Sequence, residues 1–225
     1  MSYALHVSPL PSSRISAASP ALRVDLTSQP DFTVRVLAAD GEGLSGRIVD
    51  ASRDFPYFKE GDEVFGTLED ARHLARKPRS LSFSEAAQAV MPALTAVQMV
   101  ADHGVASPAH RVLVLGADTP TGAYVTQLAK FRGSEVFSRP EARVDIVFDT
   151  LGRSAHPDVL DLIKPCGALI SSACLLDPEE SEERHLRSAF VRPRVSRARL
   201  GEVAHLFDAG ILTWRRPQQA LSALS

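Results

Sequence analysis

The 225-residue sequence has only two cysteines, Cys166 and Cys174, and both lie in or beside apolar runs. So few cysteines exclude a disulfide-rich secreted scaffold, and we expect both to be reduced core residues of an intracellular protein. No run approaches the roughly 18 apolar residues that a membrane-spanning helix needs. The N-terminus also lacks the charged-then-apolar order of a signal peptide. We therefore expect a cytoplasmic protein that does not interact with a membrane.

An excess of charge of one sign is also missing, because 25 Lys and Arg residues stand against 27 Asp and Glu residues. The net charge of −2 creates no global field that would favour nucleic acid or an anionic membrane as a partner. Basic residues do gather in RPRVSRAR, Arg192 to Arg199, which we interpret as a solvated basic loop. A hydrophobic content of 44% predicts a packed globular protein rather than a disordered one.

The first 80 residues are typical of a β-rich, irregular region. Alternation with a period of two predicts a strand at 32–39, with Phe32, Val34 and Val36 on one face. Further strands are expected at 44–52 and 58–66, the latter with a turn at residues 60–62 that directs Val64 and Phe65 inward. Prolines and serines dominate the first thirty residues, so we expect little order there.

Helical signals begin near residue 80. Ser82 and Glu85 have the spacing of a capping box and precede an alanine-rich run. Pro92 is expected to interrupt this helix, so that a second helix runs from about Ala93 and stops at Gly104.

Strands and helices alternate after residue 111. The all-apolar run 112–115 is typical of a strand buried on both faces, and the helix after it should end at Gly133. Short strands are expected at 135–137, 145–148 and 168–172, with helices at 156–163 and 198–210. This alternation predicts an α/β fold with a parallel, doubly wound sheet.

The turn Gly116–Gly122 joins the first of these strands to its helix. Unpaired amides at a helix N-terminus favour phosphate, and hydroxyls of Thr119 and Thr121 would replace the missing glycines as donors. Pro120 suits the first helical turn, whereas the charge of Asp118 would repel phosphate unless it points away and caps the helix. The alternative is an ordinary strand-to-helix loop capped by Asp118 or Thr119.

Ser138 and Arg139 follow the next strand, about twenty residues after the first glycine of the turn. An acidic residue at this place binds the ribose of NAD, whereas a hydroxyl and a guanidinium favour the 2′-phosphate of NADP. The alternative is a surface arginine beside a turn proline.

Taken together, several segments resemble the medium-chain dehydrogenase/reductase superfamily, and most closely its zinc-independent branch of quinone oxidoreductases and trans-acting enoyl reductases. The segments that carry the resemblance are YFKEGDEVFG, KPRSLSFSEAAQAVMPALTAVQMV, VLVLGADTPTGAYVTQLAKFRGSEV, VDIVFDTLG, LIKPCGALISS and LGEVAHLFDAGIL. They follow the family's order over most of residues 55–212.

The resemblance implies a reduced GroES-like β domain at 1–80 and a shortened Rossmann-type domain at 81–225. It implies NADP(H) as cofactor and hydride transfer to a small molecule, namely an enone, an enoyl thioester or a quinone. The implied positions along the cofactor are Thr95 near the nicotinamide, Gly116, Ala117, Asp118, Thr119, Pro120, Thr121 and Gly122 at the pyrophosphate, Ser138 and Arg139 at the 2′-phosphate, and Thr150 to Gly152 at the nicotinamide ribose.

The sequence also departs from the family. The cysteine and histidine patterns of the zinc branch are missing, so the sequence predicts a site without zinc. No acid or base is assigned to the reaction. Tyr57 and Tyr124 are proton-donor candidates only by residue type, and a core or turn role is favoured for both. His103, His110, His156 and His205 are expected at the surface or at helix ends.

Only seven residues, Ser138 to Val144, join the strand expected at 135–137 to the strand expected at 145–148. These two strands are expected to flank the strand at 112–115. Seven residues reach at most roughly 23–25 Å, and a return along a ~17 Å strand and across two ~4.8 Å spacings takes about 20 Å. We therefore expect the adenosine side of the cofactor pocket to be thinner and more open than in the family.

Such departures from the family leave an alternative function open beside the reductase: a catalytically reduced descendant that binds a dinucleotide or a protein, or performs a non-redox step such as cyclisation. A homodimer through an edge strand in ALISSA, 168–173, is also considered.

Overall fold

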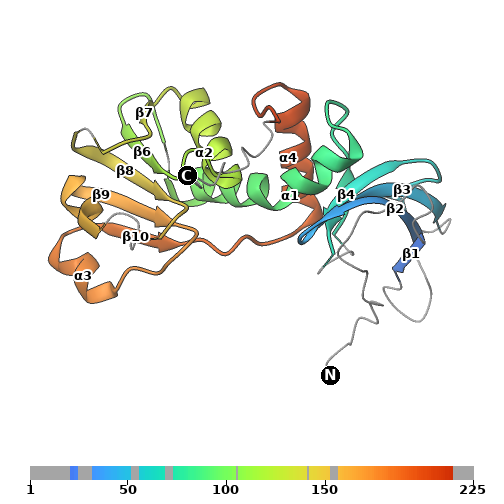
Figure 1. Cartoon of the computed structure of the whole chain (residues 1–225), viewed down its shortest axis with the longest axis horizontal. Helices are drawn as coiled ribbons and strands as arrows, with labels where there is room; N and C mark the ends of the chain where they lie inside the picture. Colours follow the sequence, from blue (N-terminus) through green and yellow to red (C-terminus); the bar gives the residue numbers. More distant parts are fainter. Residues whose placement is uncertain are drawn as a thin grey trace, which may run out of the picture.

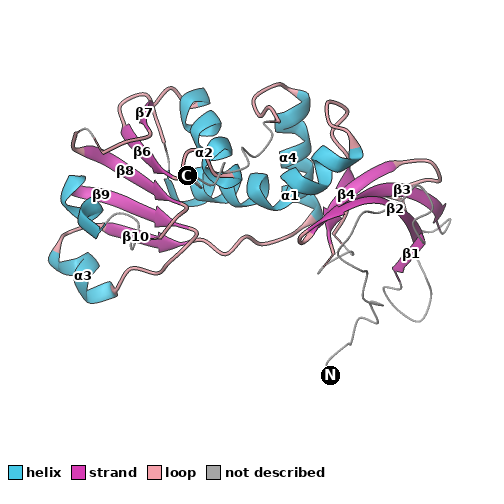
Figure 2. Ribbon diagram, in the orientation of Figure 1, coloured by secondary structure: helices cyan, strands magenta, loops and turns pink. Residues whose placement is uncertain are grey.

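The computed structural model describes residues 21–24, 32–51, 56–68, 73–104, 106–140, 142–152 and 157–214. Within these residues an antiparallel sheet and a parallel sheet lie on either side of helix α1 (Figures 1 and 2). The antiparallel sheet has the order β1-β2-β3-β4-β5, formed by Ala21–Val24, Phe32–Asp40, Gly43–Ala51, Glu63–Thr67 and Ala75–Arg76. The parallel sheet has the order β10-β9-β8-β6-β7, formed by Arg187–Phe190, Ile163–Ser171, Val144–Asp149, Arg111–Leu115 and Glu135–Phe137.

The helices are α1 (Phe83–Gln98), α2 (Pro120–Phe131), α3 (Pro178–Glu183) and α4 (Arg197–Asp208). A π-helical turn, Met99–Gly104, follows α1, and a 3-10 helix, Pro157–Leu162, precedes β9. The predicted fold class, a shortened Rossmann-like parallel sheet with an N-terminal GroES-like β region, is confirmed. In the part of the chain that the structure describes, no helix is both long and apolar enough to cross a membrane.

Strand β2 buries the residues that its period of two predicts. Phe32, Val34 and Val36 are all at most 4% exposed. In β4 the two neighbours Val64 and Phe65 are both buried but enter different cores. Val64 belongs to the small core that the antiparallel sheet forms with its own loops, whereas Phe65 belongs to the large core around α1. Successive residues therefore face opposite sides of a sheet that is covered on both.

Helix α1 begins at the predicted capping box. The amide of Glu85 donates to the Ser82 hydroxyl at 3.3 Å, and the amide of Ser82 donates to the Glu85 carboxylate at 2.8 Å. The prediction that Pro92 interrupts the helix is wrong, because α1 runs continuously through it. A proline removes one hydrogen bond, but ten residues of α1 are buried by tertiary contacts, and such packing outweighs the local propensity.

The large core is shared by both sheets. It contains Phe65 of β4 together with residues of β6, β8, β9, α2 and α4, and α1 runs through its centre. The domain boundary near residue 80 therefore stays a prediction, since α1 and the residues before it contact both parts.

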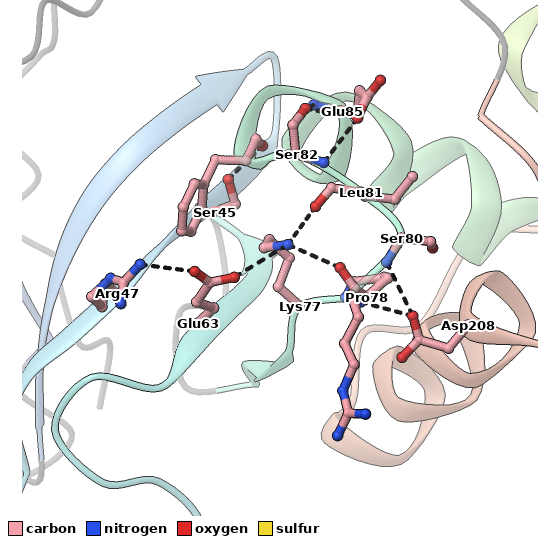
Figure 3. Close-up of polar contacts among 12 residues, drawn as sticks. Ser45, Arg47, Glu63, Lys77, Pro78, Ser80, Leu81, Ser82, Glu85 and Asp208 are labelled. Atoms are coloured by element: carbon pink, nitrogen blue, oxygen red, sulfur yellow. Dashed lines mark hydrogen bonds and ion pairs between the residues drawn. The ribbon is translucent and has the colours of Figure 1, made fainter.

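A buried lysine ties the β4–β5 region to the start of α1 (Figure 3). The ammonium of Lys77 donates to the carbonyl oxygens of Pro78, at 2.9 Å, and Leu81, and lies 3.3 Å from the Glu63 carboxylate. Asp208, at the end of α4, accepts hydrogen bonds from the amides of Arg79 and Ser80 at 2.7 and 3.3 Å. The turn before α1 is thereby fixed from both sides.

In the parallel sheet, β6 is buried at Val112 to Leu115, as the all-apolar run predicts, and α2 is followed by Gly133 at φ +85°. The suggestion that ALISSA forms an edge strand is wrong. These residues lie in and after β9, which pairs with β8 on one side and with β10 on the other. Strand β10 is the edge there, and the short sequence RSAF gave no clear strand signal.

The link from β7 to β8 is short, but the distance that it has to span is well within its reach. Strand β7 has only three residues, and its last, Phe137, pairs with Leu113. Val144 lies three residues lower in the register, so the link spans only about 14 Å. The guanidinium of Arg111 donates to Glu135 at 3.1 Å and to the carbonyl of Arg143 at 3.1 Å, which holds the link against the sheet.

Three further expectations concern the two cysteines, the helix expected at 156–163 and the order of the first thirty residues. The expectation that Cys166 is a core residue is wrong: it is exposed, at φ +64°, at an irregular place in β9, while Cys174 is half-buried and both are free. The helix expected at 156–163 is a 3-10 helix that leads directly into β9. Of the first thirty residues, for which little order is expected, the structure describes only 21–24, which form β1 and pair with β2, and the others lie outside the described residues.

We predict that Gly43→Ala destabilises the protein by about 3 kcal/mol. A Cβ at Gly43 would lie 1.9 Å from the carbonyl oxygen of Ala87, so β3 and α1 would have to separate. The matched control is Gly201→Ala on α4, where a Cβ meets nothing within 4 Å and should stabilise the helix by about 1 kcal/mol. Urea denaturation of both variants tests this, and equal midpoints would contradict it.

Candidate functional site

The turn between β6 and α2 is closed by two glycines. Gly116 has φ +77°, and a Cβ there would lie 2.4 Å from the Thr150 hydroxyl. A Cβ at Gly122 would lie 2.0 Å from the carbonyl oxygen of Gly116. Only glycine fits at both places, and the first turn of α2 therefore contacts the end of β6 directly.

Thr119 is the N-cap of α2. Its hydroxyl accepts a hydrogen bond from the amide of Gly122 at 3.0 Å and donates to the carbonyl of Gly116 at 2.7 Å. It also lies 3.0 Å from the hydroxyl of Thr150. Of the two caps considered, Thr119 is the one used, and its hydroxyl is held inside the turn. Asp118 is exposed and, among the described residues, makes no hydrogen bond through its side chain.

Three backbone amides of this turn carry no partner among the described residues, those of Ala117, Asp118 and Thr121. Pro120 occupies the first position of α2, where a helix loses nothing by lacking an N–H. Free amides at the positive end of a twelve-residue helix are the donors that a diphosphate requires. The residues present therefore fit a dinucleotide diphosphate, although the Thr119 hydroxyl does not add to the donors.

Next to this turn, the loop after β8 is held by a buried carboxylate. Asp149 is 1% exposed and accepts hydrogen bonds from the amides of Leu151 and Gly152 at 3.0 and 2.9 Å. Its second oxygen accepts from the Ser171 hydroxyl at 3.0 Å, so the ends of β8 and β9 are joined. Sequence reasoning missed Asp149 and Ser171, although an acidic residue that ends a buried apolar strand is a usable signal.

Apolar side chains are exposed at the same edge of the sheet. Leu151 after β8 is 43% exposed, and Leu175 after β9 is 68% exposed. The half-buried Cys174 directly precedes Leu175 in the chain, and its sulfur lies 3.8 Å from the Asp149 carboxylate. Figure 1 shows that β8, β9 and β10 end on the side that faces the antiparallel sheet, so this edge is directed toward the other part of the protein.

The structure brings together only some of the predicted site residues. Gly116, Thr119, Gly122 and Thr150 are in direct contact. Ser138 and Arg139 are exposed at the end of β7, the strand next to β6. Thr95 is buried in α1, where its hydroxyl donates to the carbonyl of Met91 at 2.8 Å.

The two tyrosines that were considered by residue type lie in different surroundings. Tyr124 is buried against Phe207, with the ring centroids 5.5 Å apart, which confirms its core role. Burial, and next the charge of Glu85, raises the pKa of its phenol. The ring of Tyr57 lies under the guanidinium of Arg197, 3.7 Å away.

Of the histidines, His103 and His205 are exposed and His110 is half-buried beside Ser107, whereas His156 lies outside the described residues. The described part of the chain has no group of three or more His, Cys, Asp or Glu side chains placed to hold a metal ion.

No family model matches the sequence. The curated protein NAD(P)H oxidoreductase RTN4IP1, mitochondrial, of Danio rerio is 31% identical over 172 residues, which cover 56% of this chain and 44% of that protein. Its human counterpart is 32% identical over 107 residues, covering 40% of this chain and 27% of that protein. The chain thus spans less than half the length of the curated relatives it matches.

Solved structures match over more of the chain. An alcohol dehydrogenase superfamily protein from Novosphingobium aromaticivorans has a TM-score of 0.66 at 23% identity, covering 76% of this chain and 70% of that one. The chain has the fold of the medium-chain dehydrogenase/reductase superfamily. The quinone oxidoreductase from Coxiella burnetii (TM-score 0.66, 20% identity, 78% and 69% covered) and CurK enoyl reductase (0.63, 18%, 78% and 69%) share this fold.

We predict that Thr119→Ala lowers the free energy of unfolding by about 1 kcal/mol, because the N-cap of α2 is lost, and that Thr119→Ser retains stability. Thr126→Ala is a matched control in the same helix, since the buried hydroxyl of Thr126 has no hydrogen-bond partner among the described residues. Chemical denaturation should show no loss for this control, and an equal loss in both alanine variants would argue against the capping role.

Proposed function

We propose that the protein is an NADPH-dependent oxidoreductase that works without zinc and reduces an activated double bond or a quinone. The observation that carries the proposal is the turn after β6, where two obligatory glycines leave three amides at the start of α2 that have no partner among the described residues. The relatives named NAD(P)H oxidoreductase and the similar quinone oxidoreductase and enoyl reductase structures support this reading.

In this proposal the turn 116–122 binds the pyrophosphate through its free amides. Thr150 and Gly152, on the loop fixed by Asp149, contact the nicotinamide ribose, and Thr95 of α1 lies near the nicotinamide. Ser138 and Arg139 bind the 2′-phosphate, since both are exposed directly after β7, the strand next to β6. The bound cofactor supplies the hydride, and the protein contributes binding, orientation and exclusion of water.

The substrate side follows from the exposed apolar residues at the same edge. Leu151 and Leu175 would cover the apolar face of an unsaturated acceptor and displace water from it. The Asp149 carboxylate already accepts hydrogen bonds from two amides and the Ser171 hydroxyl, so its oxygens serve to hold the loop. We therefore propose that the proton comes from solvent. The substrate is a small molecule, and a cytoplasmic location and a homodimer stay predictions.

One observation favours a second function. The hydroxyl of Thr119 is used inside the turn, so the turn offers fewer phosphate donors than the sequence predicts. A descendant with weak or no cofactor binding, acting as a binding module or in a non-redox step, is consistent with this loss.

We predict that the wild-type protein binds NADPH with a micromolar Kd and that Arg139→Gln weakens this binding roughly 10-fold, because a charged contact to the 2′-phosphate is lost. Binding of NADH, which lacks this phosphate, should stay unchanged. Arg132→Gln is the matched control, since Arg132 is also exposed but lies before β7 at the opposite end of the strand. Titration followed by cofactor fluorescence measures all three.

Oxidation of NADPH by an enone, an enoyl thioester or a quinone would support the reductase. Absence of binding at millimolar NADPH would exclude it and leave the second function. Equal affinity for NADH and NADPH would contradict the assignment of Ser138 and Arg139.

A further inference from the structure

The carboxyl group of Asp149, the last residue of β8, is 1% exposed and contacts only hydrogen-bond donors. One of its oxygens accepts from the amides of Leu151 and Gly152. The other accepts from the hydroxyl of Ser171 and lies 3.8 Å from the sulfur of Cys174. The surroundings of Asp149 therefore use this group as an acceptor on both oxygens.

These contacts require Asp149 to carry its negative charge. A protonated carboxyl group has to donate its proton to an acceptor. The Ser171 hydroxyl oxygen, 3.0 Å away, already accepts from the amides of Ala173 and Cys174 at 3.1 and 3.0 Å. Both of its lone pairs are thus occupied, and its own proton is directed to Asp149. The group is therefore a carboxylate.

This buried charge has no countercharge within the part of the chain that the structure describes. Asp149 forms no ion pair there. The ion pair between β8 and β9 lies at the opposite end of both strands, where the Lys164 ammonium is 2.8 Å from the Asp145 carboxylate. Buried charges in proteins are normally paired, because an isolated one is costly to remove from water. A positive charge from outside the chain would supply the missing partner.

The sheet places this charge beside the turn 116–122. Asp149 pairs with Leu115, so one strand spacing of about 4.8 Å separates it from the residue before the turn. Thr150 contacts the turn, whereas the Asp149 oxygens contact the loops after β8 and β9. A dinucleotide with its diphosphate at the turn and its 2′-phosphate at Arg139, after β7, extends its nicotinamide over the loop after β8.

We propose that the Asp149 carboxylate stabilises the positive charge of the oxidised nicotinamide ring and thereby favours hydride transfer from NADPH. This inference rests on the proposed reductase function. Loss of a hydride, which is one proton with two electrons, makes the neutral ring a cation. The acceptor gains the hydride and then a proton from solvent. A fixed negative charge in a site that excludes water attracts the cationic ring but not the neutral one, without touching it.

The test compares the Kd for NADP⁺ with the Kd for NADPH, because the two nucleotides differ in the charge of the ring. In the wild type NADP⁺ should bind at least as tightly as NADPH. Asp149→Asn should raise the ratio of the NADP⁺ Kd to the NADPH Kd roughly 10-fold, since the lost attraction acts on the oxidised ring alone. Isothermal titration measures both constants without turnover.

Two further variants separate the charge from the structural role of Asp149. Asp145→Asn is the matched control: it is the same change in the same strand, at the end where Lys164 already neutralises the charge. Ser171→Ala keeps the Asp149 charge but removes one of its hydrogen bonds. Both variants should retain the wild-type ratio, and any loss of affinity should be equal for the two nucleotides.

A ligand without the ring gives another readout. 2′-Phospho-ADP-ribose should bind Asp149→Asn no more weakly than the wild type, because the substitution removes a negative charge near an anion. A loss as large as the one for NADP⁺ would assign Asp149 a structural role only.

Salt gives a measurement on the wild type alone, which also applies if Asp149→Asn does not fold. Salt screens a buried charge much less than exposed ones such as Arg139. From about 0.05 M to about 0.5 M NaCl, both nucleotides should therefore bind more weakly while the ratio of their Kd values stays within about 2-fold.

An unchanged ratio in Asp149→Asn would overturn the inference, as would an equal rise in Asp145→Asn or Ser171→Ala. A wild type that binds NADPH more than about 10-fold more tightly than NADP⁺ would also overturn it. These outcomes differ from failure of the proposed function, in which neither nucleotide binds at millimolar concentration.

Discussion

Burial of helix α1 between the two sheets is the contact on which the rest of the arrangement depends. Its alanines let β3 approach so closely that Gly43 has no room for a side chain, while its other face packs on α2 and α4. One helix packs against both sheets, and the carboxyl edge of the parallel sheet faces the antiparallel sheet (Figure 1). The candidate site is therefore placed by packing that lies outside the site itself.

The turn after β6 is tightly closed, although only two of its seven residues, 116–122, are glycine. Gly116 and Gly122 are kept where a side chain would strike the backbone or Thr150. Between them, the hydroxyl of Thr119 makes the capping bonds of α2. The turn is stabilised by a side chain, and the donors left for an anion are backbone amides.

Features that depend on neighbouring residues could be predicted from the sequence. The period of two in β2, the capping box at Ser82 and the glycine after α2 are examples, because each is decided within a few residues. Predictions failed where distant contacts decide. Pro92 is accommodated by the packing of α1, and ALISSA is internal because β10 pairs beside it.

The same limit applies to the site. The turn was found from local spacing, but its N-cap could not be chosen between Asp118 and Thr119 without the position of Thr150. The role of Asp149 depends on Ser171, which is far along the chain but adjacent in the sheet.

The packing of both sheets against α1 also constrains how the protein folds during its synthesis. During synthesis the antiparallel sheet leaves the ribosome first, with the face that carries Phe65 still uncovered. Helix α1 covers it next, but remains apolar on its far side until α2 and finally α4 emerge. Because the two halves share this core, we expect the native state to form late and in one cooperative step rather than piece by piece as the chain grows.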